Sequence, residues 1–384
     1  MMLHVRAFDA TEPTSRESPW RGWPRARSWL PRHLVVAPGD GTALLVTQRL
    51  DSETGLPPVA ELASDFRDGF ARSASAPRPW SPAVVESTPD ETARVDYLTR
   101  VARAREAVRR GELRKVVVAR SEQVRGVRAF DGGMQHAALV AAAPSAIAFA
   151  LTLDGLGTWL GATPEVLARA EDGVVATSAI AGTALRSVDP DGSALRRDAK
   201  IAVEHALVVE AMRETLAPLL EGLEVASSPR VLVSERLVHL ETQMRGLLRG
   251  RASATKPSLM EITQALHPTP ALGGAPRAAA LRWLREHEGL DRGYFGGPIG
   301  WEAPSGDGVL AVGIRSALLR GAEATLFAGA GIVADSDPEA EWLETAAKLG
   351  LARSTLCTPS EVVGSGRPAD ERTGHEPRLV EVTP

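Results

Sequence analysis

Apolar residues along most of the chain fall in short runs rich in Val, Leu and Ile, a pattern typical of strands packed inside a protein. Helical spacing, with apolar residues every three or four positions, is less frequent. The strand-like runs are residues 34–38, 42–48, 115–120, 146–153, 158–162, 165–170, 173–180, 230–235, 309–319 and 324–334, and the expected helices are 92–110, 196–220, 278–287 and 338–351.

The order of these elements favours a mixed α+β (α/β) fold in one large domain. Strands come in neighbouring groups instead of alternating strictly with helices, which argues against a Rossmann or barrel fold. We expect residues 1–30, rich in Pro and Arg, to be irregular and residues 31–355 to form the domain. Residues 359–384 lack periodicity and are expected to be a flexible tail.

Composition narrows the functional classes. With 384 residues, 44% of them apolar and 24% charged, the chain is typical of globular proteins. A net charge of −4 does not favour binding to nucleic acid or to a membrane surface. The single Cys357 excludes an internal disulfide and a Cys-based metal cluster. No segment is typical of a signal peptide or a membrane span, so we expect a cytoplasmic protein.

Lysine is scarce: the chain has 44 basic residues, but only Lys115, Lys200, Lys256 and Lys348 are lysines. A codon bias towards Arg explains the scarcity. Unlike Arg, a lysine can lose its proton near neutral pH. Lys115 begins an apolar strand-like run, and if it faces inward its pKa is lowered, as a general base requires. A surface lysine at a strand edge is an equally good interpretation.

The last expected helix carries acidic residues with the spacing of a cation site. Glu341, Glu344 and Lys348 lie at i, i+3 and i+7, on one face. Two carboxylates one turn apart suit a hard divalent cation. An ordinary solvated face with a Glu–Lys pair explains the same spacing and is the more common case.

The helix expected at 196–220 places Glu204 within its apolar stripe. An ionised carboxylate there must be paired or metal-bound, because its desolvation is costly. The adjacent His205 points about 100° away around the helix and is expected to be structural or to support a ligand.

Two glycine-containing segments, 328–333 and 181–183, are interpreted as turns whose backbone N–H groups hold a carboxylate or phosphate. The first has no third glycine and no helix directly after it, so it is a weak match to a dinucleotide-binding fingerprint.

Together these segments resemble the chorismate-utilising enzymes, which include isochorismate synthase, salicylate synthase, the large subunit of anthranilate synthase and aminodeoxychorismate synthase. The resemblance covers residues 90–352 and implies an anthranilate-synthase-like single domain, in which two large, mainly antiparallel sheets pack together with helices outside. Its motifs, in family order, are KVVVAR (115–120), GATPEVL (161–167), TSAIAGTALR (177–186), EHALVVE (204–210), VHLETQMRG (238–246), LHPTPALGGAPR (266–277), RGYFGGPIGW (292–301), AVGIRSA (311–317) and AGAGIVADSDPEAEWLETAAKL (328–349).

The resemblance also implies a site and a reaction. Lys115 would be the base that activates water for attack at C2 of chorismate, and Glu165 the acid that protonates the departing C4 hydroxyl. Family members need Mg²⁺, which would hold the ring carboxylate of chorismate. The implied metal ligands are Glu204 and Glu344 with Glu341 close by, and the implied substrate-binding residues are Gly182, Thr183, His239, Ala271, Leu272, Phe295, Arg315, Gly331 and Lys348.

Absent motifs favour water as the nucleophile. The stretch after Glu204 and His205 lacks the Arg-Asn-Asp run of anthranilate-type members, and Ala181 occupies the position of the nucleophilic lysine in some aminodeoxychorismate synthases. The resemblance is therefore strongest to isochorismate synthase, an isomerase that serves menaquinone or siderophore biosynthesis. Salicylate synthase is the alternative, followed by an aminating enzyme or a non-catalytic chorismate-binding relative. We expect chorismate as the ligand, no glutamine amidotransferase subunit, and a monomer or weak homodimer.

Overall fold

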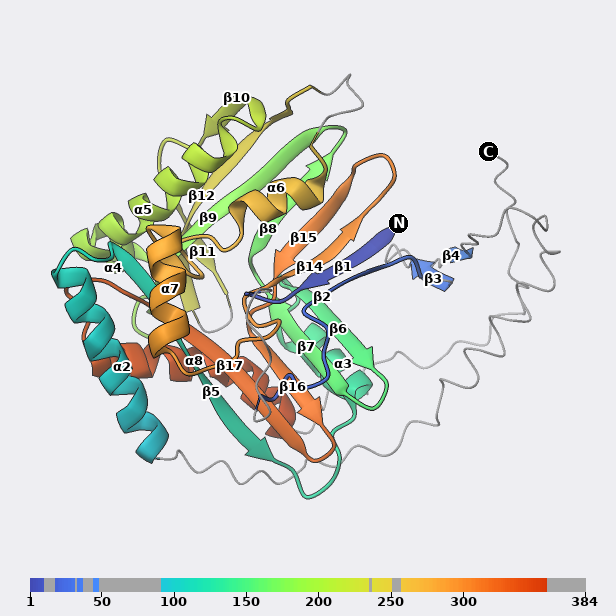
Figure 1. Ribbon diagram of the computed structural model, residues 1–384, viewed down its shortest axis with the longest axis horizontal. Coiled ribbons are helices and arrows are strands. Elements are labelled where there is room, and N and C mark those ends of the chain that lie inside the picture. Colours follow the sequence, from blue (N-terminus) through green and yellow to red (C-terminus); the bar gives the residue numbers. More distant parts are fainter. Residues whose placement is uncertain are drawn as a thin grey trace.

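The computed structural model describes residues 1–9, 18–31, 33–36, 44–47, 91–234, 237–250 and 257–357. This part of the chain forms two large sheets and a small two-stranded sheet, in which neighbouring strands pair in antiparallel fashion. Figure 1 shows their arrangement.

The nine-stranded sheet contains β1 (Met2–Arg6), β2 (Ala26–Trp29), β8 (Val166–Glu171), β9 (Val174–Leu185), β10 (Leu220–Val225), β11 (Arg230–Val233), β12 (Leu237–Leu248), β14 (Pro298–Glu302) and β15 (Gly308–Val312). The six-stranded sheet contains β5 (Lys115–Arg125), β6 (Ile147–Leu153), β7 (Gly157–Thr163), β13 (Gly274–Ala275), β16 (Ser316–Arg320) and β17 (Glu323–Ile332). The small sheet pairs β3 (His33–Val36) with β4 (Leu44–Thr47).

Helices cover the outer faces of both large sheets (Figure 1). They are α2 (Glu91–Arg109), α3 (Gly132–Ala142), α4 (Ser193–Arg197), α5 (Ala199–Leu216), α6 (Leu259–Leu266), α7 (Arg277–His287) and α8 (Pro338–Cys357). Helices α2 and α8 contact the six-stranded sheet through β5 and β17, whereas α5 and α6 contact β9 and β8 of the nine-stranded sheet. The main hydrophobic core joins both sheets, with Val118 of β5, Leu167 of β8 and Val208 of α5 in one buried cluster. The expected fold class, two antiparallel sheets with outer helices, is confirmed.

Two of the four expected helices, 92–110 and 278–287, match α2 and α7 closely. The helix expected at 196–220 is shorter, because Asp198 caps α5 by accepting a hydrogen bond from the Ile201 N–H at 3.1 Å. Helix α8 begins at Pro338 as expected but continues to Cys357. Three helices were missed: the Gly- and Ala-rich α3, the short α4, and α6, although Ser258 and Glu261 form a capping box at the start of α6.

The expectation that residues 1–30 are irregular is wrong for β1 and β2. Strand β1 pairs with β14, whose residues 299–302 lie far away in the sequence, and with β2. Local composition cannot reveal this partner, because the pairing is non-local. Trp20, between the two strands, is buried against Trp159 and Tyr294. The expected tail at 359–384 lies outside the described residues, and the domain bounds stay a prediction.

Two neighbouring connections pass from one large sheet to the other at the same place. The chain leaves β7 and enters β8 through Pro164 and Glu165, and it leaves β15 and enters β16 through a segment that ends at Arg315. The run 309–319, expected as one strand, is therefore divided between two sheets, with Arg315 at φ +53°. The Val312 N–H donates to the Glu165 carbonyl oxygen at 3.0 Å, which holds the two connections together.

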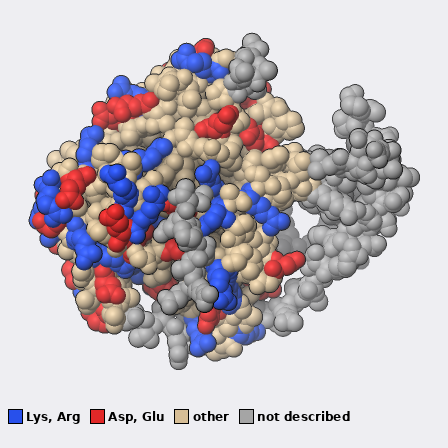
Figure 2. All heavy atoms as spheres, in the orientation of Figure 1, with Lys and Arg blue, Asp and Glu red and all other residues tan. Residues whose placement is uncertain are grey.

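None of the described helices has the length and apolar character needed to cross a membrane. On the face shown in Figure 2, acidic and basic side chains are interspersed over the described surface.

Candidate active site

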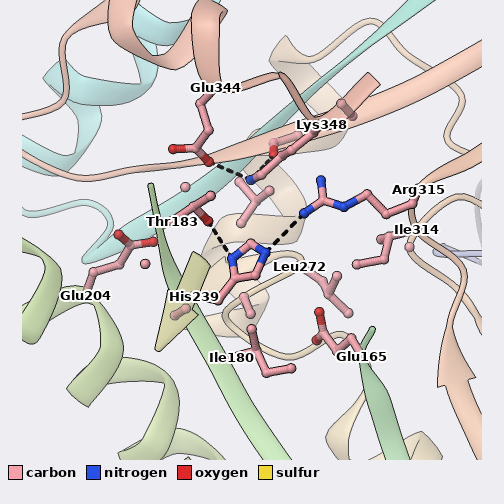
Figure 3. Close-up of a pocket in the computed structure, with 18 of the residues that line it drawn as sticks. Glu165, Ile180, Thr183, Glu204, His239, Leu272, Ile314, Arg315, Glu344 and Lys348 are labelled. Carbon is pink, nitrogen blue, oxygen red and sulfur yellow. Dashed lines mark hydrogen bonds and ion pairs between the residues drawn. The ribbon is translucent and has the colours of Figure 1, made fainter. Parts of the chain in front are cut away.

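One cavity lies where the two sheets meet. It is lined by every residue that the family resemblance placed in the site: Lys115, Glu165, Gly182, Thr183, Glu204, His239, Ala271, Leu272, Phe295, Arg315, Gly331, Glu341, Glu344 and Lys348. These residues come from both sheets, from α5 and α8, and from the loops before β13 and β14. Figure 3 shows how several of them point toward one another. The structure thus brings the whole predicted set together, and the individual roles stay predictions.

Lys115 faces inward, so the interpretation as a surface lysine is wrong. It begins β5, is 1% exposed, and its Nζ lies 2.7 Å from Oε1 of Glu204 on α5. The buried carboxylate of Glu204 is therefore paired, as its place in the apolar stripe requires. Gly331 of β17 leaves room for this pair, since a Cβ there would lie 2.6 Å from both Glu204 Oε1 and Lys115 Cε.

Glu165 lies in the connection between β7 and β8, where both sheets bury it. Desolvation raises the pKa of Glu165 to about 7, and the positive charges of Arg315, Lys348 and Lys115 only partly oppose this effect. Among the described residues this carboxyl group has no ion-pair partner. A carboxyl group with this pKa holds a proton at neutral pH for much of the time, so it can act as a general acid.

His239 connects Thr183 with Arg315 at the cavity wall (Figure 3). Its Nδ1 lies 3.0 Å from Thr183 Oγ1, and its Nε2 lies 3.4 Å from Arg315 Nη2. Since a guanidinium can only donate, Nε2 is the acceptor and Nδ1–H donates to Thr183. Burial, followed by the charges of Arg315 and Lys348, holds the pKa of His239 well below its usual value, so the ring is neutral.

The segment 181–183 is a β-bulge in β9 instead of a free turn. Opposite β12, His239 pairs with Thr183 and the next residue pairs with Ala181, which leaves Gly182 unpaired at φ +81°. The other glycine segment, 328–333, is also not a turn, because β17 runs to Ile332 in register with β5. The expectation of a turn is wrong for both segments, because each lies within a paired strand; that their backbone N–H groups hold a carboxylate stays a prediction.

Helix α8 brings two carboxylates to the cavity. Asp337 caps its start, as expected, by accepting a hydrogen bond from the Ala340 N–H at 2.9 Å. Glu344 pairs with Lys348 at 2.5 Å, and the same ammonium donates to the Gly329 carbonyl oxygen at 2.8 Å. The Glu–Lys pair expected of a solvated face does form, but it faces the cavity.

The cluster of carboxylates fits a divalent cation by its donor chemistry. Desolvation, with repulsion from Glu344 and Glu204, raises the pKa of Glu341 to about 7. Mg²⁺ is commonly held by one or two carboxylates together with oxygens of the substrate and of water. The cavity provides the carboxylates, and it is open to substrate and water. No three His, Cys, Asp or Glu side chains in the described ranges converge on a single point as a ready-made metal site.

Two charged residues of the cavity were missed as site residues. Lys200 lies on the rim, with its Nζ 3.7 Å from Glu341 Oε1, and Arg292 forms part of the wall. Arg292 belongs to one of the recognised motifs, and the scarcity of lysine was the available signal for Lys200.

His205 has a structural role, as expected. Its Nδ1–H donates to the Ala181 carbonyl oxygen at 3.2 Å, and its Nε2 accepts from Thr242 Oγ1 at 2.7 Å. Desolvation lowers the pKa of His205, and the ring is not part of the cavity wall.

Residues 1–357 match a family model described as chorismate binding enzyme. The chain belongs to this family. The resemblance to chorismate-utilising enzymes is therefore confirmed for the family as a whole.

Individual family members agree with this assignment. The chain is 41% identical over 270 residues to the salicylate biosynthesis isochorismate synthase of Pseudomonas aeruginosa, covering 68% of this chain but only 55% of that protein. It is 31% identical over 364 residues to isochorismate synthase MenF of Bacillus subtilis, covering 91% of this chain and 73% of that protein. A solved structure of MenF, the menaquinone-specific isochorismate synthase from Escherichia coli, matches with a TM-score of 0.74 and 26% identity, over 92% of this chain and 78% of that chain.

Proposed function

We propose that this chain is an isochorismate synthase, which isomerises chorismate to isochorismate by adding water at C2 and releasing the C4 hydroxyl. One observation carries the proposal: a buried lysine and a buried carboxyl group whose pKa is raised to about 7 line the same cavity. A base and an acid held at fixed, separate positions are what attack at one ring carbon and departure from another require.

Proton transfer is balanced between Lys115 and Glu165. Lys115 gives up its contact with Glu204 and, in its neutral form, takes a proton from the water that attacks C2. Glu165 donates its proton to the C4 hydroxyl, which leaves as water while the ring double bonds shift. One water enters and one departs, so the reaction is an isomerisation. Each proton transfer contributes roughly 10²–10⁴-fold to the rate.

The cavity provides cations for an anionic substrate. Burial lowers the pKa of Arg315 to about 10, which leaves the guanidinium charged at neutral pH, and His239 contacts it from one side. A planar guanidinium of this kind suits a carboxylate, and we assign Arg315 with Gly331 to the pyruvyl carboxylate of chorismate. Leu272, Ala271 and Phe295 line the cavity and would contact the ring.

The proposed cofactor is Mg²⁺, which Glu204 and Glu344 would bind, with Glu341 beside them. When bound, it would neutralise the ring carboxylate of chorismate, and Lys348, Gly182 and Thr183, which line the same cavity, would support that carboxylate. A cytoplasmic location, action without a glutamine amidotransferase subunit, and a monomer or weak homodimer all stay predictions.

The product distribution tests the proposal. The purified chain is incubated with chorismate and Mg²⁺, and the products are separated by liquid chromatography. Isochorismate as the sole product is the expected result. Salicylate together with pyruvate would assign the chain to salicylate synthases instead. No conversion by the wild-type chain, or full conversion by Glu165→Gln, would overturn the assignment of this site.

A further inference from the structure

Three of the four cavity carboxylates, namely Glu204, Glu341 and Glu344, each have a lysine of their own; the fourth is Glu165. The pairs, given as N–O distances, are Glu344–Lys348 at 2.5 Å, Glu204–Lys115 at 2.7 Å and Glu341–Lys200 at 3.7 Å. The chain's own ammonium groups therefore neutralise the acidic cluster. A cation that binds to these carboxylates has to compete with lysines that are part of the protein.

Lys200 differs from the other two lysines in how firmly it is held. Its side chain is 35% exposed, compared with 2% for Lys115 and 15% for Lys348. Lys348 also donates to the Gly329 carbonyl oxygen, and Lys115 is enclosed by the sheets. Lys200 has the longest of the three contacts and lies at the rim, so its ammonium can move into water without exposing a buried side chain.

The place of Lys200 in α5 favours its departure. It is the second residue of the helix, whose first turn contains no acidic residue, and the carboxylate of the capping residue Asp198 is engaged by the Ile201 N–H. The positive end of the helix macrodipole repels a lysine at this position. The contact of the Lys200 ammonium with Glu341, across on α8, holds it at the cavity.

We propose that Lys200 is a tethered counter-ion, which neutralises Glu341 while the cavity lacks a divalent cation and releases this carboxylate when the cation binds. The inference rests on the proposed function only in taking the three carboxylates as ligands of the cation. Because ammonium and metal compete for one carboxylate, Lys200 weakens metal binding in the absence of substrate. When no cation is bound, Lys200 thereby reduces the repulsion between the three carboxylates. After a cation has displaced its ammonium from Glu341, the lysine stays at the rim of the cavity.

A binding titration with Mn²⁺, performed on the full chain without substrate and at low salt, tests the proposal. The free ion is measured by its electron paramagnetic resonance signal. Lys200→Gln should bind Mn²⁺ roughly three- to tenfold more tightly than the wild type, as expected for the loss of a half-exposed ion pair. Lys200→Arg keeps the charge and should bind Mn²⁺ with wild-type affinity.

Arg213→Gln is the matched control, because it removes one positive charge from an exposed position near the other end of α5. It should leave the dissociation constant unchanged. Equal tightening by Arg213→Gln, no tightening by Lys200→Gln, or no binding of Mn²⁺ by the wild type would each overturn the proposal. If Mn²⁺ binds more tightly to Lys200→Gln but the wild type converts no chorismate, the counter-ion role stands and the proposed function fails.

Discussion

Two buried ion pairs border the same cavity, and they are built differently. In Glu288–Arg292 the guanidinium donates twice to the carboxylate, at 2.6 and 2.7 Å, and also to the carbonyl oxygens of Val117 and Leu272. Glu288 additionally accepts from the Ala119 N–H at 2.7 Å. In Lys115–Glu204 a single contact of 2.7 Å joins an ammonium, which has three donors, to a carboxylate at the cavity surface.

The difference separates a structural pair from one that can take part in chemistry. Arg292 and Glu288 have nearly all their hydrogen-bonding capacity committed, and they tie β5 to the loop that carries Leu272. The lysine and carboxylate of the other pair keep free capacity on the cavity side, so each can exchange its partner for water, substrate or a cation. Burial alone does not distinguish these two cases; the number of partners does.

The largest expected effect comes from breaking the structural pair. Arg292→Met leaves Glu288 charged, buried and without its main partner, so the free energy of unfolding should fall by about 3–5 kcal/mol. Urea denaturation, followed by circular dichroism, measures this change.

Lys115→Met is the matched substitution in the other pair. It should cost clearly less stability, because the freed Glu204 carboxylate faces the cavity, where water can solvate it. Conversion of chorismate should nevertheless be lost in this variant. Equal losses of stability in the two variants would contradict the distinction between the pairs.

A smaller effect is expected where a glycine makes room for the Lys115–Glu204 pair. Gly331→Ala would place a methyl group 2.6 Å from Glu204 Oε1, which forces the pair apart and should cost about 1–3 kcal/mol in transition-state or folding free energy.

Gly329→Ala, two residues earlier in β17, is the control. Its Cβ would meet Val117 Cγ1 at 3.2 Å, a contact that a small shift relieves. Steady-state kinetics and thermal unfolding of both variants check the expectation. It fails if Gly329→Ala is as harmful as Gly331→Ala.

The smallest effect is a pH dependence from the buried Glu165. Because burial raises its pKa to about 7 and the reaction uses its protonated form, kcat/KM should fall above pH 7, by about tenfold per pH unit. Since the pKa of Glu341 is also raised to about 7, the profile is measured at two Mg²⁺ concentrations. The pH at which activity falls because of Glu165 should be the same at both Mg²⁺ concentrations. A fall caused by the acidic cluster should instead shift to another pH when the Mg²⁺ concentration changes. An activity that rises through pH 7 would show that Glu165 acts as a carboxylate.

Local sequence features predicted much of this site. The periodicity of α8 and its Asp337 cap placed Glu341 and Glu344 on one face, and the apolar stripe of α5 required a partner for Glu204. Ordered family motifs supplied the remaining positions, including Lys115. These features were accessible because each depends on spacing within one segment or on a motif read in order.

Other features needed partners far away in the chain. The division of residues 309–319 between two sheets, the strands formed by residues 2–6 and 26–29, and the bulge at Gly182 all follow from strand pairing over long sequence separations. No local pattern records such pairings, so the connection that carries Arg315 was expected as the interior of a strand.

The sequence by itself determined the family, the fold class and fourteen of the residues that line the cavity. Only the tertiary structure decided their electrostatic states. It paired Lys115 with Glu204, left Glu165 without an ion-pair partner among the residues that the structure describes, and brought Lys200 of α5 to Glu341 of α8. The physical reason is that the charge state of a buried group depends on desolvation and on distances to other charges, and these exist only after both sheets and both helices have assembled around the cavity.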